Sequence, residues 1–466
     1  MNALLATLLG AVFAPLLFGA GIVRLCGLAP ARGWRLYLAW SYLLGHFVQA
    51  WLTFGWIAAG KPVPGWSLPA MAAAAGLGLL LCLRRRGGAG SPPREAGSPP
   101  REAGDPWVRA VVVLLAVVLL DACSLQSLEA ILTNDEANIW SAKAWVLYAG
   151  ADLRALSVVY AQHADYPMLD PMAQVLAFAS SGHATWWENR LPVQGFAFAL
   201  LLLLSVAVER RLPRALAIAV LVAFTASRFV DFAPTVYADV LLAFALLALV
   251  DAWLRGQETG ELVWWRLGCM AAAAMLATKN EGAMLAVAAS VAAVVARALT
   301  RTAVLPRPGP AWLWLLVPAC TVAMGQWFNA HHGLSNDLTT AADGSGLFGR
   351  MLQRGGERVG PVLSHYAGLL VAGDVTRWLV LAALVAPLAK ARDVARAAWC
   401  WPWLLCVLAL GGYVLVFLGT SADSGGPDGP ARGLLWHLST AADRTLLHVL
   451  PTAVLTVCTC LGRTRP

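Results

Sequence analysis

Apolar residues in this chain gather into long continuous runs that are separated by polar segments. A transmembrane α-helix needs about 17–25 such residues, and thirteen runs come near that length. The runs at 283–297 and 377–389 are the shortest, so either is compatible with a tilted or partly re-entrant segment. We therefore predict an all-α integral membrane protein with about 13 transmembrane helices. The predicted helices lie near 4–23, 36–58, 66–83, 107–126, 191–208, 213–230, 237–254, 262–278, 283–297, 311–328, 377–389, 399–418 and 444–461.

The composition excludes several other classes of protein. Hydrophobic residues make up 59% of the 466 residues and charged residues 13%, whereas a soluble chain carries about 25% charged residues. A water-facing surface over most of the chain is therefore excluded, as is a disordered or coiled-coil protein. The nine cysteines lie within or beside apolar stretches. None has metal-ligand spacing in a polar loop, so neither a disulfide framework nor a zinc site is indicated.

The net charge of +8 indicates membrane orientation rather than nucleic-acid binding. The basic residues are scattered between apolar runs instead of forming a patch, so we expect no nucleic-acid partner. If the segment 84–109 is cytoplasmic, the loops on that side carry 22 of the 34 Lys and Arg residues, although the opposite loops are longer. Cytoplasmic loops are enriched in Lys and Arg. The pattern predicts an N-terminus outside the cell and a C-terminus inside it.

A polar segment divides the chain into two unequal parts. The sequence SPPREAG occurs twice in tandem, at 91–97 and 98–104. It is rich in proline and charge and has nothing to bury, which is typical of a flexible spacer. We therefore predict an N-terminal three-helix membrane unit at 1–83, a cytoplasmic linker at 84–106 and a larger membrane domain at 107–466.

Three segments on the predicted outer side are long, namely 127–190, 329–376 and 419–443. They contain six of the eight histidines, and the first of them holds seven acidic residues against three basic ones. A transport pathway would place ionisable residues in the middle of the membrane. Here they gather just beyond the outer ends of the helices, which favours chemistry at the outer interface.

The first candidate site follows the apolar run that ends near 126. Asp135 and Glu136 form a carboxylate pair before an amphipathic stretch at 139–147, and on a regular helix Glu136 and Lys143 share a face. Such a pair can act as a general base or bind a metal ion. The alternative is that these residues only cap a short helix.

The second candidate is the sequence from His163 to Pro167, which includes Asp165 and Tyr166. Proline restricts the residue before it to extended or turn conformations, so the sequence predicts an ordered, polar, aromatic loop. Its side chains could bind a sugar by stacking and hydrogen bonding. A simple surface turn is the competing interpretation.

Two further candidates lie at predicted outer helix ends. Asp239 stands near the start of the run at 237–254, where a carboxylate has a desolvation cost and where helix capping is the alternative. Lys279 and Glu281 belong to a short polar segment between two apolar runs, and Lys279 is one of only four lysines. We expect Lys279 to have a partner, which could be Glu281, a lipid head group or a substrate phosphate.

The last candidate lies where the chain enters its final apolar run. Arg444 is suited to binding a phosphate through two parallel hydrogen bonds, and His437 precedes it by seven residues. In the alternative, Asp443 caps the helix and Arg444 extends to the membrane surface. Together the candidates place carboxylates, cations and aromatic residues on one membrane face, where an anionic lipid-linked molecule would present its head group.

The order of these motifs resembles the polytopic GT-C glycosyltransferases over about 107–466. The resemblance is closest to the bacterial branch with protein O-mannosyltransferase-like and lipid A aminoarabinose-type enzymes. In that family the Asp-Glu pair usually follows the first helix, whereas here it follows the fourth, and residues 1–106 have no counterpart. The matching motifs are Asp-Glu at 135–136, Lys-Ala-Trp at 143–145, Tyr-Pro-x-Leu at 166–169, Tyr-Ala-Asp at 237–239, Ala-Thr-Lys-Asn-Glu-Gly at 277–282 and His-Leu-x-Thr-x-x-Asp-Arg at 437–444.

This resemblance implies transfer of a sugar from a polyprenyl-phosphate carrier to an acceptor outside the cytoplasm, with inversion at the anomeric carbon. Asp135 would be the catalytic base or a metal-linked carboxylate, and Glu136 would support it. Lys279 and Arg444 would hold the carrier phosphate. With no second acidic pair to complete an oxygen site, a divalent cation stays an open question. The sugar or acceptor pocket would include Lys143, His163, Asp165, Tyr166, Asp239, Glu281 and His437.

The resemblance also implies an enzyme of the cell envelope, in the bacterial inner membrane, with its active site on the periplasmic side. Its partners would be the lipid bilayer, the lipid-linked sugar and an acceptor whose identity stays open. One alternative is a transporter or flippase for a lipid-linked glycan. Another is an enzyme like the O-antigen ligases or polymerases, which the Arg- and His-bearing segment 329–376 would suit. Its stretch at 344–372 could equally be an interfacial lid over a lipid groove.

Overall fold

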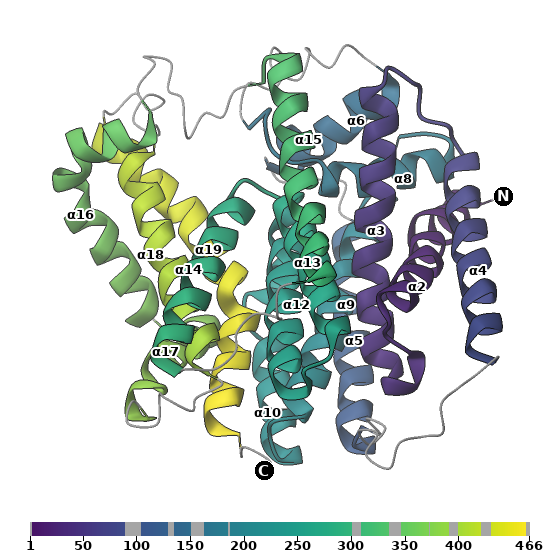
Figure 1. Cartoon of the computed structure of the whole chain (residues 1–466). Coiled ribbons are helices and arrows are strands. Elements are labelled where there is room, and N and C mark those ends of the chain that lie inside the picture. The colour runs from purple at the N-terminus through teal and green to yellow at the C-terminus, as the bar shows by residue number, and fades with distance from the viewer. Residues whose placement is uncertain are drawn as a thin grey trace.

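The computed structural model describes residues 2–88, 104–128, 135–150, 163–184, 187–300, 309–334, 346–371, 373–390, 399–420 and 430–462. These residues form helices joined by turns, and no strand occurs among them. Most of the long helices run up and down through one bundle, as Figure 1 shows, and the two ends of the chain lie at different heights of that bundle. An all-α architecture is confirmed for the part of the chain that the structure describes.

The N-terminal helices begin with a continuous helical stretch from Ala3 to Cys26, which contains one π-helical segment. The stretch ends at Gly27, whose φ of 104° lies in the left-handed region that glycine adopts without strain. A 25-residue helix then returns along it. The elements of this part are α1 (Ala3–Thr7), η1 (Leu8–Phe13), α2 (Ala14–Cys26), η2 (Pro30–Arg32), α3 (Trp34–Ala58) and α4 (Ser67–Gly88).

The rest of the chain forms the larger part of the bundle. In Figure 1 the short helices α6 and α8 lie near its top, and the α16–α19 group lies at one side. These elements are α5 (Pro106–Leu128), η3 (Glu136–Ser141), α6 (Ala142–Ala149), α8 (Leu169–Ser181), α9 (Arg190–Glu209), α10 (Arg214–Thr225), α11 (Phe229–Phe232), α12 (Ala238–Thr259), α13 (Leu262–Leu276), α14 (Glu281–Thr300), η4 (Pro310–Leu315), α15 (Leu316–His332), α16 (Leu347–Val371), α17 (Val375–Val385), α18 (Cys400–Gly419) and α19 (Pro430–Leu461).

Every predicted apolar run coincides with a helix, but not every helix is long enough to span a bilayer alone. Seven helices in the described part of the chain are long and apolar enough to cross a membrane, or up to eight if the bent pair α16–α17 is one span. Helices such as α10 and α13, of 12 and 15 residues, are shorter. A membrane protein is therefore supported, and the number of 13 crossings stays a prediction.

Salt bridges confirm which segments share an end of the bundle. At one end Arg32 binds Glu261 at 2.5 Å and Arg35 binds Glu209 at 2.5 Å, and Arg214 binds Asp105 at 2.6 Å. All six residues come from loops that the charge pattern assigns to the cytoplasm. The segments assigned to the outside meet one another in the same way at the opposite end, as described below. Which end faces the cytoplasm remains a prediction.

Exposed tryptophans mark both ends of the bundle. Trp34 and Trp107 begin α3 and α5 beside the salt-bridged loops, with 51% and 63% of their surfaces exposed. Trp56 and Trp66 lie at the other end of α3 and just before α4, and are also exposed. Tryptophan is enriched where a membrane meets water. Exposed tryptophans at both ends of the bundle are therefore the pattern expected where the two surfaces of a bilayer meet the protein.

The N-terminal helices are packed onto the larger domain rather than separated from it. Besides the Arg32 and Arg35 salt bridges, the hydroxyl of Tyr42 on α3 donates to the carbonyl of Pro192 on α9 at 2.7 Å. Helix α4 continues to Gly88, five residues beyond the predicted end of the unit at 83. The tandem SPPREAG repeat, at 91–104, lies outside the described residues except for its last glycine.

Candidate functional site

A buried carboxylate near the start of α12, Asp239, is the centre of the candidate site. Its side chain is wholly buried and binds three groups from other parts of the chain. The Lys279 ammonium lies 3.1 Å from one oxygen, the Arg444 guanidinium lies 3.0 Å from the other, and the His448 ring nitrogen Nε2 donates at 2.6 Å. Helix α12 has Tyr237 at its N-cap position, so Asp239 does not cap it. With three donors around it, this carboxylate organises the cluster.

Arg444 connects the buried part of the cluster to its open part. Its guanidinium binds Asp239 with one nitrogen and Asp135 with the other, the latter at 2.5 Å, and it lies 4.5 Å above the ring of Tyr237. The side chain of Asp135 is 35% exposed, against 16% for Arg444. Asp135 lies at the N-cap position of η3, as the capping alternative expected, but its side chain makes no capping hydrogen bond and binds Arg444 instead. The structure thus brings Asp135, Lys279 and Arg444 together.

The turn that carries Lys279 is fixed by tight local packing. Helix α13 ends at Leu276 and α14 begins at Glu281, whose carboxylate also binds the Lys279 ammonium at 3.1 Å. A Cβ atom at Gly282 would lie 2.2 Å from the carbonyl oxygen of Met275, so only glycine fits there. The close approach holds Lys279 beside Asp239. Of the three partners considered for this lysine, Glu281 is bound, together with Asp239, which was not among them.

Glu136 is buried and binds the backbone of the segment before α12, so it does not face the open part of the site. Its carboxylate accepts from the amide of Val236 at 2.9 Å and lies 4.0 Å from the guanidinium of Arg190. It therefore fixes the turn that leads into α12 and Asp239. The segment from Glu136 to Ser141 is a π-helix, a form that recurs at functional sites. Its wider turns replace the regular helix on which Glu136 and Lys143 were expected to share a face.

The predicted aromatic loop is ordered and lies against the cluster. The rings of His163 and Tyr166 are stacked, with centroids 4.5 Å apart and planes 18° apart. The ammonium groups of Lys143 and Lys279 lie 5.5 and 5.8 Å from the centre of the Tyr166 ring. Lys143 also donates to the carbonyls of His163 and Tyr166. His163 has a φ of 59°, which is uncommon for a residue other than glycine.

Asp165 ties this loop to two other segments. The amide nitrogen of Asn280 donates to its carboxylate at 2.6 Å, and that of Asn329 donates to its backbone carbonyl at 3.1 Å. The next segment begins with another link, from the Leu169 amide to the carbonyl of Ala277 at 2.9 Å. The interpretation of residues 163–167 as a simple surface turn is therefore wrong, because Asp165 and Tyr166 are buried.

A second buried polar network lies behind the cluster. The side-chain amide of Gln174 donates to Asp170 at 2.8 Å and accepts from Asn189 and Ser141. Asp170 is outside the candidate membrane spans. Burial, followed by the negative charges of Asp239 and Glu136, raises its pKa to about 8. Asp170 is therefore a neutral acid near neutral pH, close enough to the cluster to sense its charge.

The sequence interpretation missed two members of the cluster. His448 links Asp239 to Tyr413, whose hydroxyl lies 2.6 Å from the other ring nitrogen of His448. Both residues lie inside long apolar helices and are fully buried. The available signal was the single histidine inside the apolar run at 444–461, four residues after Arg444. Ionisable residues in such runs are rare and mark functional positions.

Two predicted features of the 419–443 segment differ from the structure. Helix α19 begins at Pro430, not near 444, so Asp443 lies within a helix and does not cap it. Its carboxylate instead binds Arg377 at 3.2 Å. Among the described residues, His437 contacts Thr420 and Phe417 at the end of α18 and does not join the Asp239 cluster.

The cluster is a set of paired acids and cations, which suits it to binding a charged ligand in place of one of its own carboxylates rather than to holding a metal ion. No group of three or more His, Cys, Asp or Glu side chains that could hold a metal occurs in the part of the chain that the structure describes. The acids Asp135, Asp239 and Glu281 are instead paired with Lys279 and Arg444. An anionic ligand would therefore have to replace a carboxylate as the partner of one of these cations.

No family model, curated protein or solved structure matches this chain. The function of the protein therefore has to be inferred from the geometry of the site.

Proposed function

We propose that this protein is a membrane glycosyltransferase, which moves a sugar from a polyprenyl-phosphate donor to an acceptor at the outer face of the membrane. The observation that carries the proposal is the bridge from Arg444 to both Asp135 and the buried Asp239. It joins a partly exposed carboxylate, which can take a proton, to cations that can hold a phosphate. The order of the motifs, which resembles the GT-C glycosyltransferases, supports the same activity.

In the proposed reaction Asp135 takes the proton of an acceptor hydroxyl as its oxygen attacks the anomeric carbon. The bond from that carbon to the carrier phosphate breaks, and the polyprenyl phosphate leaves with the electron pair. Arg444 and Lys279 stabilise the negative charge that grows on the phosphate. One displacement from the opposite face inverts the anomeric carbon. Glu136 supports this arrangement by holding the turn before α12.

The pairing of Arg444 with Asp135 suggests how donor binding prepares the base. The Asp135 oxygen that accepts from Arg444 at 2.5 Å is engaged by that arginine and not by an acceptor hydroxyl. A donor phosphate that takes over that nitrogen of Arg444 would release Asp135. The second nitrogen would stay on Asp239, which keeps the guanidinium in place. Proton abstraction would then depend on a bound donor.

The stacked rings of His163 and Tyr166 are the proposed platform for a sugar. Aromatic faces bind the apolar face of a sugar ring, and nearby polar groups bind its hydroxyls. Lys143 fixes the loop through two carbonyls, so its role is to position the platform. Asp165 and Glu281 complete the polar surroundings. The proposed location is the bacterial inner membrane, with the site on the periplasmic side.

One observation favours a second function, transport of a lipid-linked glycan. The chain from Tyr413 through His448 to Asp239 is buried among apolar helices, as proton-coupled transporters require. The ligase-like alternative has less support, because Arg350 and Arg358 donate to carbonyls at the end of α18. These two arginines are engaged in joining α16 to α18.

Reconstitution into liposomes separates the two functions. The protein would be given a polyprenyl-phosphate donor with a labelled sugar, and both new labelled products and movement of intact donor between leaflets would be measured. We expect labelled sugar on a new acceptor without faster donor movement. Faster donor movement with no new glycoside would replace the transferase by the transporter.

A further inference from the structure

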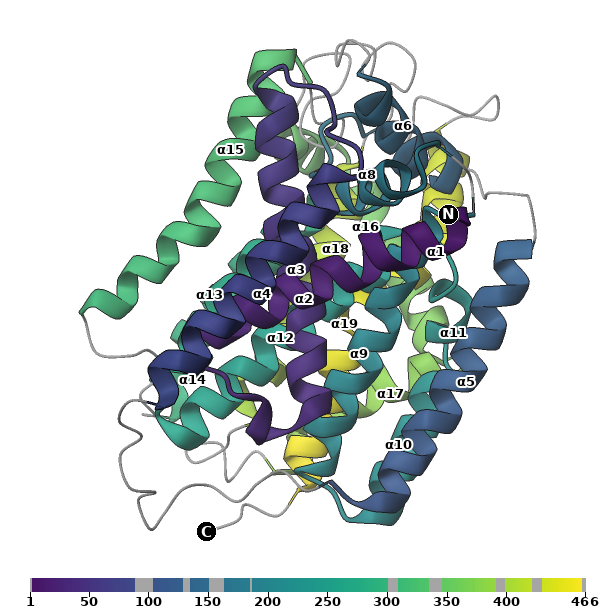
Figure 2. The ribbon, with the colours of Figure 1, turned by 90° about the vertical axis from the view of Figure 1, so that its right-hand side faces the viewer.

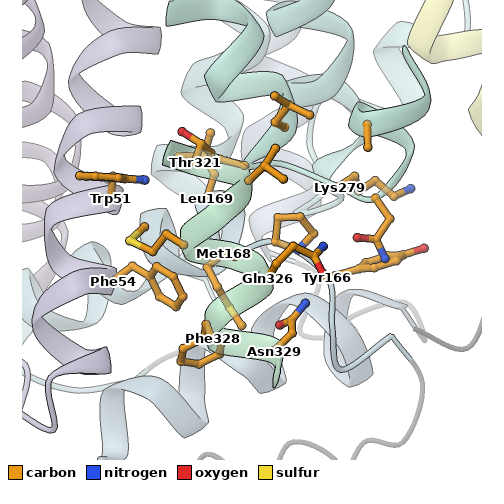
Figure 3. Close-up of a pocket in the computed structure, with 18 of the residues that line it drawn as sticks. Trp51, Phe54, Tyr166, Met168, Leu169, Lys279, Thr321, Gln326, Phe328 and Asn329 are labelled. Atoms are coloured by element: carbon orange, nitrogen blue, oxygen red, sulfur yellow. The ribbon is translucent and has the colours of Figure 1, made fainter. Parts of the chain in front are cut away.

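An apolar groove leads into the candidate site from the side of the bundle. Its walls come from α3, through Phe47, Trp51 and Phe54, and from α15, through Val322 and Phe328. We call it the α3–α15 groove. Figure 3 shows Trp51 and Phe54 on one side of this space and Tyr166 and Lys279 on another, with Met168 and Leu169 between them.

Two phenylalanine rings close the α3–α15 groove at one end, and exposed side chains of α15 border it. The rings of Phe54 and Phe328 meet with centroids 4.6 Å apart. Away from this contact α15 diverges from α3, as Figure 2 shows. Val322, which lines the groove, is 44% exposed, and the neighbouring Trp327 is 52% exposed. An apolar slot of this kind is accessible to a hydrocarbon chain that moves in from the membrane.

The inner end of the groove is polar but mostly uncharged. Asp165, Asn280, Gln326 and Asn329 line it, and Lys279, which already binds two carboxylates, lies behind them. Amide groups and a carboxylate can donate to and accept from hydroxyl groups in several directions. Lys279 is the one cation among the described residues that line the groove, and a single ammonium lacks the planar fork with which an arginine binds a phosphate. The inner end therefore suits a head group rich in hydroxyls.

The other side of the cluster has the opposite character. Arg444 lies there with Asp135, and Arg377 and Arg228 both lie near Asp443, the residue before Arg444. Arginine is the residue that binds phosphates most directionally. A charged phosphate and a hydroxylated head group would therefore approach the cluster from different sides.

We propose that the α3–α15 groove binds a hydrocarbon chain of a membrane lipid whose uncharged, hydroxyl-rich head group lies against Asp165 and Asn280. On the proposed function, this lipid is the sugar acceptor, and the donor phosphate binds on the Arg444 side. The N-terminal helices then have a function, because α3 supplies one wall of the acceptor groove. This wall lies outside the part of the chain that resembles the GT-C enzymes.

Photo-crosslinking to the full-length protein in lipid nanodiscs tests this proposal without needing turnover. One probe is a diacylglycerol with a neutral monosaccharide head group and a diazirine in one acyl chain. The other is a polyprenyl phosphate with a diazirine in its chain. A Cβ at Gly325, which lines the groove, would meet no atom within 4 Å, so Gly325→Phe starts in open space and adds a ring to the groove wall.

Gly55→Phe is the matched control, because a Cβ at Gly55 also has no neighbour within 4 Å and Gly55 does not line the groove. Both variants would first be checked for an unchanged thermal unfolding midpoint. We expect the glycolipid probe to label peptides containing residues 47–54 and 321–329. Gly325→Phe should lower that labelling by about 10-fold or more, which corresponds to about 1.4 kcal/mol of binding free energy, and Gly55→Phe should not.

Three results would overturn the proposal. They are absence of glycolipid labelling in these peptides, labelling that Gly325→Phe leaves unchanged, and stronger labelling by the polyprenyl-phosphate probe, which would assign the groove to the donor. Labelling of an Asp135→Asn variant should equal that of the wild type. If the groove is labelled but the protein transfers no sugar, lipid binding stands and only the acceptor role fails.

Discussion

Arg444 lies between two carboxylates of different exposure, with one nitrogen on the wholly buried Asp239 and another on Asp135, which is 35% exposed. The buried contact fixes the guanidinium, and the outer contact can be exchanged for a ligand. This relationship explains how an arginine in an apolar helix can be both firmly placed and available to a phosphate. It also assigns separate roles to two acids that lie 104 residues apart in the chain.

The Arg444→Lys variant tests whether this double contact matters. A lysine ammonium has no planar fork and cannot reproduce two directed contacts to separate carboxylates. We expect the KM for the polyprenyl-phosphate donor to rise by about 10-fold or more, equivalent to about 1.4 kcal/mol. Donor-concentration series of sugar transfer provide the measurement. Arg35→Lys is the control, because Arg35 binds Glu209 and Ser205 at the opposite end of the bundle. An unchanged donor KM in Arg444→Lys would remove Arg444 from phosphate binding.

His448 and Tyr413 should stabilise the fold through their link to Asp239. His448→Ala would leave the buried Tyr413 hydroxyl without this partner, at a cost of about 1–3 kcal/mol, and would remove one of the three donors to Asp239. Tyr413→Phe removes only the hydroxyl and should cost less. Thermal unfolding in detergent measures both. Equal unfolding midpoints for wild type and His448→Ala would contradict a structural role for the hydrogen bonds that link Tyr413, His448 and Asp239.

The raised pKa of Asp170 predicts how the stability of the protein depends on pH. Its pKa is about 8 in the folded protein and about 3.9 in an unfolded chain. Between these values only the folded state holds the proton, so this group contributes stability that is complete below about pH 4 and is lost as the pH rises toward about 8. Asp170→Asn keeps a neutral acceptor for Gln174 at every pH.

We therefore expect the free energy of unfolding of Asp170→Asn at about pH 8 to exceed that of the wild type, by on the order of 5 kcal/mol at about 1.36 kcal/mol per pKa unit. The difference should narrow steadily toward about pH 5. Thermal unfolding across this range provides the measurement. A difference that does not change with pH would show that Asp170 is ionised in the folded protein.

Gly282 should tolerate no side chain. Its missing Cβ lies 2.2 Å from the Met275 carbonyl oxygen, so Gly282→Ala must displace the turn that carries Lys279, at about 1–3 kcal/mol. Gly325→Ala is the matched helical control in open space, where alanine should stabilise by up to about 1 kcal/mol. Chemical unfolding of both variants makes the comparison. A neutral Gly282→Ala would show that the turn is loosely held.

The helices were predictable because bilayer-length apolar runs specify them directly, and each such run coincides with a helix. The sharing of one face by Asp135, Asp239, Lys279 and Arg444 was also predictable, because charge asymmetry between alternate loops assigns segments to a side. Assigning each loop to one side of the membrane gives no distances between residues. Which of these residues pair with one another could therefore not be predicted from the sequence.

The remaining features depend on contacts that are distant in sequence. Glu136 was interpreted as a helper of Asp135, but its partner is the amide of Val236, 100 residues away. His448 and Tyr413 stand alone in apolar runs, and only the packing of α18 against α19 brings them together. The early start of α19 at Pro430 was missed because polar residues interrupt the apolar pattern there.

Sugar transfer by Asp135→Asn is the most direct test of the central claim. The variant would be compared with wild type and with Asp443→Asn, a matched change at a nearby acid that binds Arg377, using a labelled polyprenyl-phosphate donor in proteoliposomes. We predict that Asp135→Asn lowers kcat by about 100-fold or more, as loss of a general base does, while Asp443→Asn retains most activity. Full transfer activity in Asp135→Asn would contradict the account.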